Sequence, residues 1–131
     1  MLLQPLQLLA MAWNRSAFDA DKVKEASNEL GISEEVSSQE IHIIAPKQAE
    51  NGAIVQVEIS SGIPNTQQIT VLVENNPTVL IAHFVLHDGV KPEVVTRIKM
   101  AETSDIKVVV KAGSQYFTCS QQVSVLENGC G

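Results

Sequence analysis

Positive charge and aromatic side chains are both scarce in this chain. Of its 131 residues only 4% are aromatic, and 15 acidic residues outnumber 9 lysines and arginines, which gives a formal net charge of −6. A nucleic-acid-binding protein needs a basic patch for the phosphates, and single strands are usually held by aromatic stacking. The composition therefore argues against a nucleic-acid partner.

Long apolar runs and recognisable metal or catalytic motifs are also missing. No run approaches the roughly 18 apolar residues of a transmembrane helix, so no membrane-spanning segment is expected. His83 and His87 are the nearest approach to a metal pair, but on one strand they would lie about 13 Å apart, too far for one zinc ion. With His42 they are expected to be ordinary surface or edge histidines, and neither a metal nor a cofactor is expected.

Cysteine is rare as well. Cys119 and Cys130 are the only two, which is too few for a disulfide framework. Cys119 shares strand parity with Phe117 and Val123, and this favours a small buried side chain. A Cys119–Cys130 disulfide is the alternative, and it requires Cys119 to face outward or to lie at a strand edge.

The residues that are present indicate one globular, exported domain. Hydrophobic residues make up 44% of the chain and charged residues 18%, as in folded domains. Residues 1–12 hold a short apolar stretch that ends in Ala10-Met11-Ala12, the small-x-small pattern that signal peptidase cuts. Although a positive n-region is missing, we expect a residual signal-peptide-like segment and a periplasmic location. The alternative is a short apolar helix that packs on the domain.

Residues 13–40 are expected to form an N-terminal helix followed by a linker. Apolar residues recur at helical spacing, Asp19 or Asp21 can cap the helix, and Gly31 is a stop signal. The stretch 33–40 is polar and is expected to have no regular structure.

Residues 41–126 change to a period of two. Short runs of alternating apolar residues are separated by turn residues such as Asn51-Gly52 and Asp88-Gly89. About seven such strands predict a mainly β protein, an antiparallel β-sandwich of immunoglobulin-like type that carries the N-terminal helix.

One run, residues 79–86, is apolar on both faces. One face must fill the core, and the other, formed by Val79, Ile81 and Val85, needs a cover of its own. Either the N-terminal helix packs there, or these three residues form an interface with a partner protein, since large exposed apolar patches usually mark interfaces. The sequence leaves both readings open.

Residues 127–131 are expected to form a flexible carrier arm, in which Asn128, Gly129 and Gly131 surround Cys130. Extended, this arm reaches about 16 Å. A neighbouring glutamate and the C-terminal carboxylate disfavour the thiolate, and no lysine, arginine or helix N-terminus nearby favours it. Cys130 is therefore predicted to be a handle that partner enzymes activate, and the alternative is a frayed terminus with an incidental cysteine.

Several short segments together form a specific pattern. They are Ala12-Trp13-Asn14 with Ala17-Phe18, Ile44-Ala45-Pro46, Ala49-Glu50-Asn51-Gly52-Ala53, Ile63-Pro64-Asn65, Val73-Glu74-Asn75-Asn76-Pro77, Thr96-Arg97-Ile98-Lys99-Met100, Glu102-Thr103-Ser104, Val109-Val110-Lys111-Ala112-Gly113 and the C-terminal run around Cys130. This pattern resembles the SoxY family, the sulfur carriers of periplasmic thiosulfate oxidation, from about Ala12 to the last residue.

The resemblance implies a carrier that is not itself an enzyme. It implies an immunoglobulin-like sandwich that pairs with a second small sandwich protein, SoxZ, and that can self-associate when it is alone. It also implies that Cys130 is the covalent attachment site. A haem oxidase joins thiosulfate to the cysteine sulfur, and a hydrolase then releases sulfate and leaves a persulfide.

The chain departs from the family pattern at several points. The family's usual C-terminal run is Gly-Gly-Cys-Gly-Gly, whereas here Asn128 replaces the first glycine and the sequence ends at Gly131. The twin-arginine signal usual in the family is absent, and Cys119 is not a usual family cysteine. Asn128 is expected to stiffen the carrier arm.

Two other classes of protein fit parts of the sequence. A secreted structural or adhesion sandwich would use Cys130 for an intermolecular disulfide, so it would form a lasting covalent dimer without sulfur-bearing adducts. An enzyme with an unrecognised site would turn over substrate without partners.

Overall fold

The computed structural model describes residues 22–127. The signal-like segment, the two candidate capping aspartates Asp19 and Asp21, and the run around Cys130 lie outside these residues. Within them, no helix is long and apolar enough to cross a membrane.

A short helix, α2 (Val23–Glu29), precedes nine strands in the described part of the chain. The strands are β1 (Glu35–Ser37), β2 (Ile41–Ile44), β3 (Gln48–Asn51), β4 (Val55–Ser61), β5 (Thr66–Val73), β6 (Leu80–Val85), β7 (Glu93–Ile98), β8 (Ser104–Ala112) and β9 (Gln115–Glu127).

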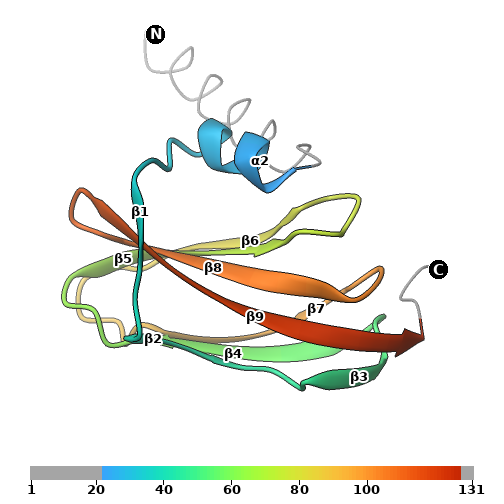
Figure 1. Cartoon of the computed structure of the whole chain (residues 1–131). Coiled ribbons are helices and arrows are strands. Elements are labelled where there is room, and N and C mark those ends of the chain that lie inside the picture. Colours follow the sequence, from blue (N-terminus) through green and yellow to red (C-terminus); the bar gives the residue numbers. More distant parts are fainter. Residues whose placement is uncertain (1–21, 128–131) are drawn as a thin grey trace, which may run out of the picture.

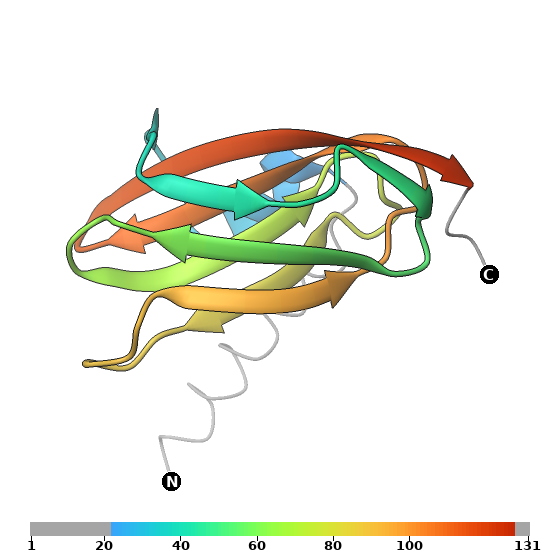
Figure 2. The ribbon, with the colours of Figure 1, turned by 90° about the horizontal axis from the view of Figure 1, so that it is seen from below.

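The strands form two sheets that pack face to face as an immunoglobulin-like sandwich (Figures 1 and 2). The larger sheet has the order β1-β9-β8-β5-β6, with β3 paired to another part of β9, and the smaller sheet has the order β2-β4-β7. The predicted mainly β sandwich with an N-terminal helix is confirmed. Most pairings are antiparallel as expected, but β1 and β3 both run parallel to β9.

The alternation of apolar residues explains how the main core forms. Along β4, Val55, Val57 and Ile59 are buried while the residues between them are exposed. Ile106, Val108 and Val110 of β8 are fully buried in the same cluster. Successive side chains on a strand point to opposite faces, so these residues meet between the two sheets.

Two strands lie where no strand was expected. β1 falls within the polar stretch 33–40, and β3 has only one buried residue, Ala49. Neither strand has alternating apolar residues, because each one pairs only with β9. β1 is fixed instead by an ion pair, in which Lys107 Nζ lies 2.6 Å from Glu35 Oε2 and both side chains are largely buried.

Helix α2 covers part of the outer face of the larger sheet (Figure 1). Ala26 of the helix and Ile32 just after it pack against Leu72 of β5 and Val109 of β8. The N-cap residue is Lys22, which makes no side-chain capping bond, so the expected aspartate cap is not used at this position. Packing therefore stabilises this seven-residue helix, since isolated helices of such length are marginal.

A β-bulge in β6 corrects the expectation for the doubly apolar run. Val71 pairs with Ala82 but the next residue, Leu72, pairs with Leu80, so Ile81 is the extra residue. A bulge shifts the side-chain parity of a strand. The prediction that Val79, Ile81 and Val85 share one face is therefore wrong.

The three residues lie in three different environments. Val79 is fully buried in the cluster beneath α2, and Ile81 packs partly buried against the main core. Val85 is 61% exposed. The helix thus covers the Val79 end of the run, and only Val85 remains available to a partner.

Candidate functional site

Strand β9 ends at the end of the sandwich where it pairs with β3 (Figure 1). Glu127 had been expected to begin the carrier arm, but it is the last residue of β9. Cys130 follows three residues later. Residues 128–131, called the tail below, lie outside the described residues, so the site is built here from the place where the tail begins.

The end of β9 that leads into the tail is called the root below. Strand β3 and the turn after it hold one side of this root. Asn51 is paired with Glu127, and the Gly52 N–H donates a hydrogen bond to the Glu127 carbonyl at 3.1 Å. Asn51 Oδ1 accepts a hydrogen bond from the Ala53 N–H at 2.8 Å, which fixes the turn itself. The last residue before the tail is therefore part of a hydrogen-bonded ladder.

The segment between β7 and β8 holds the other side. Thr103 Oγ1 accepts a hydrogen bond from the Val125 N–H at 2.8 Å. The Met100 N–H donates to the Gly52 carbonyl at 2.7 Å. The root is thus tied on both sides by segments that are distant in sequence.

Two neighbouring asparagines in the β5–β6 turn brace that segment. Asn76 Nδ2 donates to the Lys99 carbonyl at 2.7 Å, and Asn76 Oδ1 accepts from the Ala101 N–H at 2.9 Å. Asn75 Nδ2 donates to the Thr103 carbonyl at 2.8 Å. We call the hydrogen bonds made by Asn75, Asn76 and Thr103 the brace.

The surface around the root is partly apolar and partly acidic. Ile54 is 69% exposed and Leu126 is 63% exposed. Glu50, Glu102 and Glu127 are exposed as well. We call these five residues the rim.

Cys119 lies away from the rim and faces inward. Its thiol is free, and the half-buried side chain packs against the main core together with Phe117. The expected inward direction is confirmed, but the side chain is half-buried and not fully buried. A disulfide to Cys130 would need Cys119 to turn away from that core.

His83 lies on an edge strand of the larger sheet, in agreement with the expectation of surface or edge histidines. It is half-buried on β6, its Nδ1 is hydrogen-bonded to Thr70 Oγ1 at 2.8 Å, and burial lowers the pKa of the ring. His42 and His87 are exposed, as expected. Among residues 22–127, no group of three or more His, Cys, Asp or Glu side chains could hold a metal ion.

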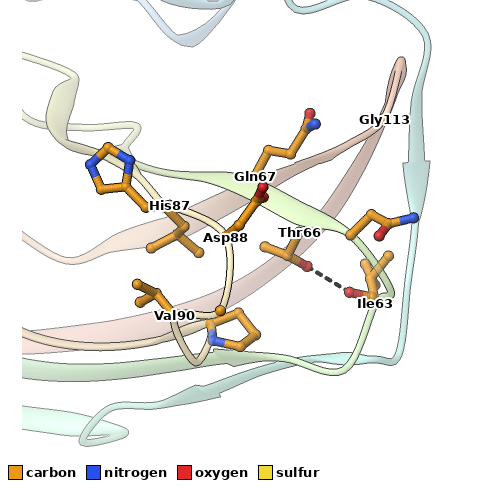
Figure 3. Close-up of a pocket in the computed structure, with 11 residues that line it drawn as sticks. Ile63, Thr66, Gln67, His87, Asp88, Val90 and Gly113 are labelled. Carbon is orange, nitrogen blue, oxygen red and sulfur yellow. Dashed lines mark hydrogen bonds between the residues drawn. The ribbon is translucent and has the colours of Figure 1, made fainter.

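A cavity of about 370 Å³ lies at the opposite end of the sandwich, where the β8–β9 turn is (Figure 3). His87, Asp88 and Val90 of the β6–β7 connection line it together with Thr66 and other residues. Thr66 Oγ1 donates to the Ile63 carbonyl at 2.7 Å, so this hydroxyl is already engaged. Among the described residues that line the cavity, Thr66 carries the only hydroxyl.

Comparison with protein families decides what the chain is. The model described as "Sulfur oxidation protein SoxY" matches residues 27–130. The chain belongs to the SoxY family. The matched range includes the whole sandwich, the brace, the rim and Cys130.

A solved structure agrees with this membership. The sulfur carrier protein SoxY from Chlorobium limicola f thiosulfatophilum is 34% identical, the match covers 79% of this chain and 96% of that one, and the TM-score is 0.72. No curated protein sequence matches the chain. The resemblance to SoxY drawn from the sequence is confirmed, and it supports a carrier role in sulfur oxidation.

The sequence had suggested Cys130 but not what holds the strand that leads to it. The segments containing Asn76 and Thr103 were part of the SoxY pattern, yet their role is visible only in the structure. Polar residues at turns are usually assigned to local turn geometry. Here they join turns that are far apart in the chain.

Proposed function

We propose that this SoxY chain is an exported, periplasmic sulfur carrier of thiosulfate oxidation and does not catalyse the reactions itself. Cys130 holds the sulfur intermediates covalently and presents them to partner enzymes. The observation that carries the proposal is the family match, which runs through the sandwich as far as residue 130. The braced strand β9 supports it, because β9 ends at Glu127 and Cys130 follows three residues later in the sequence.

The proposed chemistry occurs on the Cys130 sulfur in two steps. In the first step the thiol and thiosulfate form an S–S bond, giving Cys–S–S–SO₃⁻, one proton and two electrons, which a haem oxidase accepts. In the second step a hydrolase adds water to the terminal sulfonate. Sulfate and two protons leave, and Cys130 keeps a persulfide anion.

Intact-mass measurement tests this proposal. The protein is incubated with thiosulfate and the haem oxidase of the same oxidation system, and a thiosulfate adduct is expected on the wild type and on Cys119→Ser. Cys130→Ser should carry none. An adduct that survives Cys130→Ser would contradict the proposal, as would a covalent dimer that forms without any sulfur-bearing adduct.

We further propose that a SoxZ-like small sandwich protein binds the outer face of the larger sheet at its Val85 end. Val85 is 61% exposed there, while α2 covers the Val79 end. The same surface would support self-association when the chain is alone. An exposed apolar side chain beside a covered one is suited to the edge of such an interface.

A charge at position 85 tests the interface. Val85→Asp should abolish complex formation in analytical ultracentrifugation while the monomer still unfolds cooperatively. Val95→Asp is the matched control, because Val95 is 64% exposed but lies on β7 in the other sheet. If both variants lose binding equally, or if neither loses it, the partner binds at another surface of the chain.

A further inference from the structure

We infer that the rim is the docking surface for the enzyme that modifies Cys130, and that this enzyme contacts Ile54 and Leu126 through an apolar surface around its active-site entrance. The inference rests on the proposed function of Cys130. It adds where on the sandwich the enzyme binds and what kind of surface the enzyme presents.

The short reach of Cys130 requires such a contact. Glu127 is fixed in β9 by the Gly52 hydrogen bond, so the only chain that can extend toward an enzyme begins at residue 128. Three residues span at most about 11 Å, from the Cα of Glu127 to that of Cys130. The reacting atoms of the enzyme must come that close to the end of the sandwich.

The size of protein interfaces then brings the rim into contact. Even a small interface of about 500 Å² per partner spans a disc of roughly 13 Å radius. Ile54 lies two residues from Gly52, and Leu126 lies next to Glu127. An enzyme that reaches Cys130 therefore also covers both of these side chains.

The rim has the composition of a contact surface. Ala49 and Val125 are paired, and both pack against the core. Since side chains alternate along a strand, Leu126 and Glu50, the residues that follow them, point away from that core. Leu126, which is 63% exposed, thus lies next to Glu127 in the chain and beside Glu50 of the paired strand, and Ile54, which is 69% exposed, follows the turn that holds Glu127. The facing surface therefore has to be apolar where it meets Leu126 and Ile54 and neutral or basic around them.

The brace makes the rim a fixed platform. Asn76 and Thr103 connect the β5–β6 turn, the β7–β8 segment and β9 through hydrogen bonds of 2.7 to 2.9 Å. A fixed surface loses little conformational freedom on binding, which favours a transient but specific complex.

The test compares single rim variants with a matched control. Ile54→Asp and Leu126→Asp should each lower the second-order rate constant for adduct formation at Cys130 by about tenfold, as expected for a charge in an apolar contact. Ile44→Asp should react at the wild-type rate, because Ile44 is 64% exposed but lies on β2, outside the rim. The haem oxidase and thiosulfate are the reagents, and adducts are followed by intact mass.

Two further measurements separate docking from other causes. In a Cys119→Ser background, iodoacetamide should alkylate Cys130 equally fast in all variants, because a small reagent needs no docking surface. Thermal unfolding midpoints should agree between the rim variants and Ile44→Asp. Rim variants that accept thiosulfate at the wild-type rate, or a control that slows equally, would overturn the inference while the carrier function stands.

Lengthening the tail provides an independent test. Six Gly/Ser residues inserted between Glu127 and Asn128 extend the reach of Cys130 by about 20 Å. The reduction of the rate constant by Ile54→Asp should then shrink from about tenfold to less than about threefold, because the enzyme no longer has to cover the rim. An undiminished penalty would show that reach is not the reason for the contact. A wild-type protein that forms no adduct at all would instead refute the proposed function.

Discussion

The two ends of the sandwich are tied in different ways. At the end with the cavity, side-chain hydrogen bonds such as those among Ser61, Ile63 and Thr66 join residues two to five positions apart in the sequence. At the end with the rim, the bonds of Asn75, Asn76 and Thr103 join residues 22 to 29 positions apart. The first set shapes individual turns, whereas the second set connects separate segments.

Under the proposed function, a cavity is a poor guide to the site in this protein. The cavity of about 370 Å³ lies at one end of the sandwich, while β9 leads into the tail at the other end. A carrier needs no pocket for its cargo, because the partner enzyme supplies the pocket. It needs a fixed point from which the attachment residue extends.

The largest expected effect comes from removing the centre of the brace. Asn76→Ala deletes an acceptor for the Ala101 N–H and a donor to the Lys99 carbonyl, and Asn76 is buried. The free energy of unfolding should fall by about 2–3 kcal/mol in urea titration. Thr66→Ala, at the cavity end, should cost only about 1 kcal/mol. Equal losses of stability in the two variants would mean that the side-chain hydrogen bonds at the two ends contribute equally.

Thr103→Val tests the bond that reaches β9 directly. The Val125 N–H loses its acceptor, so stability should fall by about 1–2 kcal/mol, and hydrogen exchange at the Val125 amide should become faster. Thr118→Val is the control on β9, because the Thr118 hydroxyl is buried and has no hydrogen-bond partner within residues 22–127. Thr118→Val should leave the free energy of unfolding unchanged or raise it. A decrease as large as that of Thr103→Val would contradict the role assigned to the Thr103–Val125 hydrogen bond.

A backbone change at the cavity end should have a smaller effect. Gly113 has a φ of +63°, and an added Cβ would meet no atom within 4 Å. Gly113→Ala should therefore cost about 1 kcal/mol through conformation alone, and Gly113→Asn should cost less. The rate of adduct formation at Cys130 should stay at the wild-type value in both. A slower rate would show that the two ends are coupled.

The smallest effect concerns His83, which belongs to neither end. Burial lowers its pKa below the ordinary value of 6.5 in the folded protein, so below about pH 6.5 the unfolded chain binds more protons. The free energy of unfolding should therefore decrease as the pH falls through this range. His83→Gln should reduce that decrease. Thermal unfolding of the wild type and of His83→Gln between pH 7.5 and 5 measures this effect.

The sequence predicted those parts of the fold that depend on local pattern. The alternation in β4 and β8 and the helical spacing before Gly31 each appear as expected, because burial of one face decides them. β1 could not be predicted, because its one apolar residue, Val36, is exposed and β9 provides its pairing. The bulge at Ile81 was equally hidden, since a run that is apolar on both faces does not reveal its parity.

The candidate site was predictable only in its chemistry. A cysteine close to glycines indicated a handle, and this role remains a proposal because Cys130 lies outside the described residues. The brace was not predictable, because an asparagine in a turn gives no sign of whether it bonds locally or to a segment more than twenty positions away.

The parallel pairing of β1 and β3 with β9 has a consequence for how the protein is made. Both strands are synthesised early, but their pairing partner is the final strand, so both remain unpaired until β9 has been completed. Contacts between such distant segments form late and slowly, because a long loop must close first. The last ladder to form is therefore the one that leads into the tail, and a chain that is unfinished or misfolded lacks the fixed end of β9 that precedes the tail.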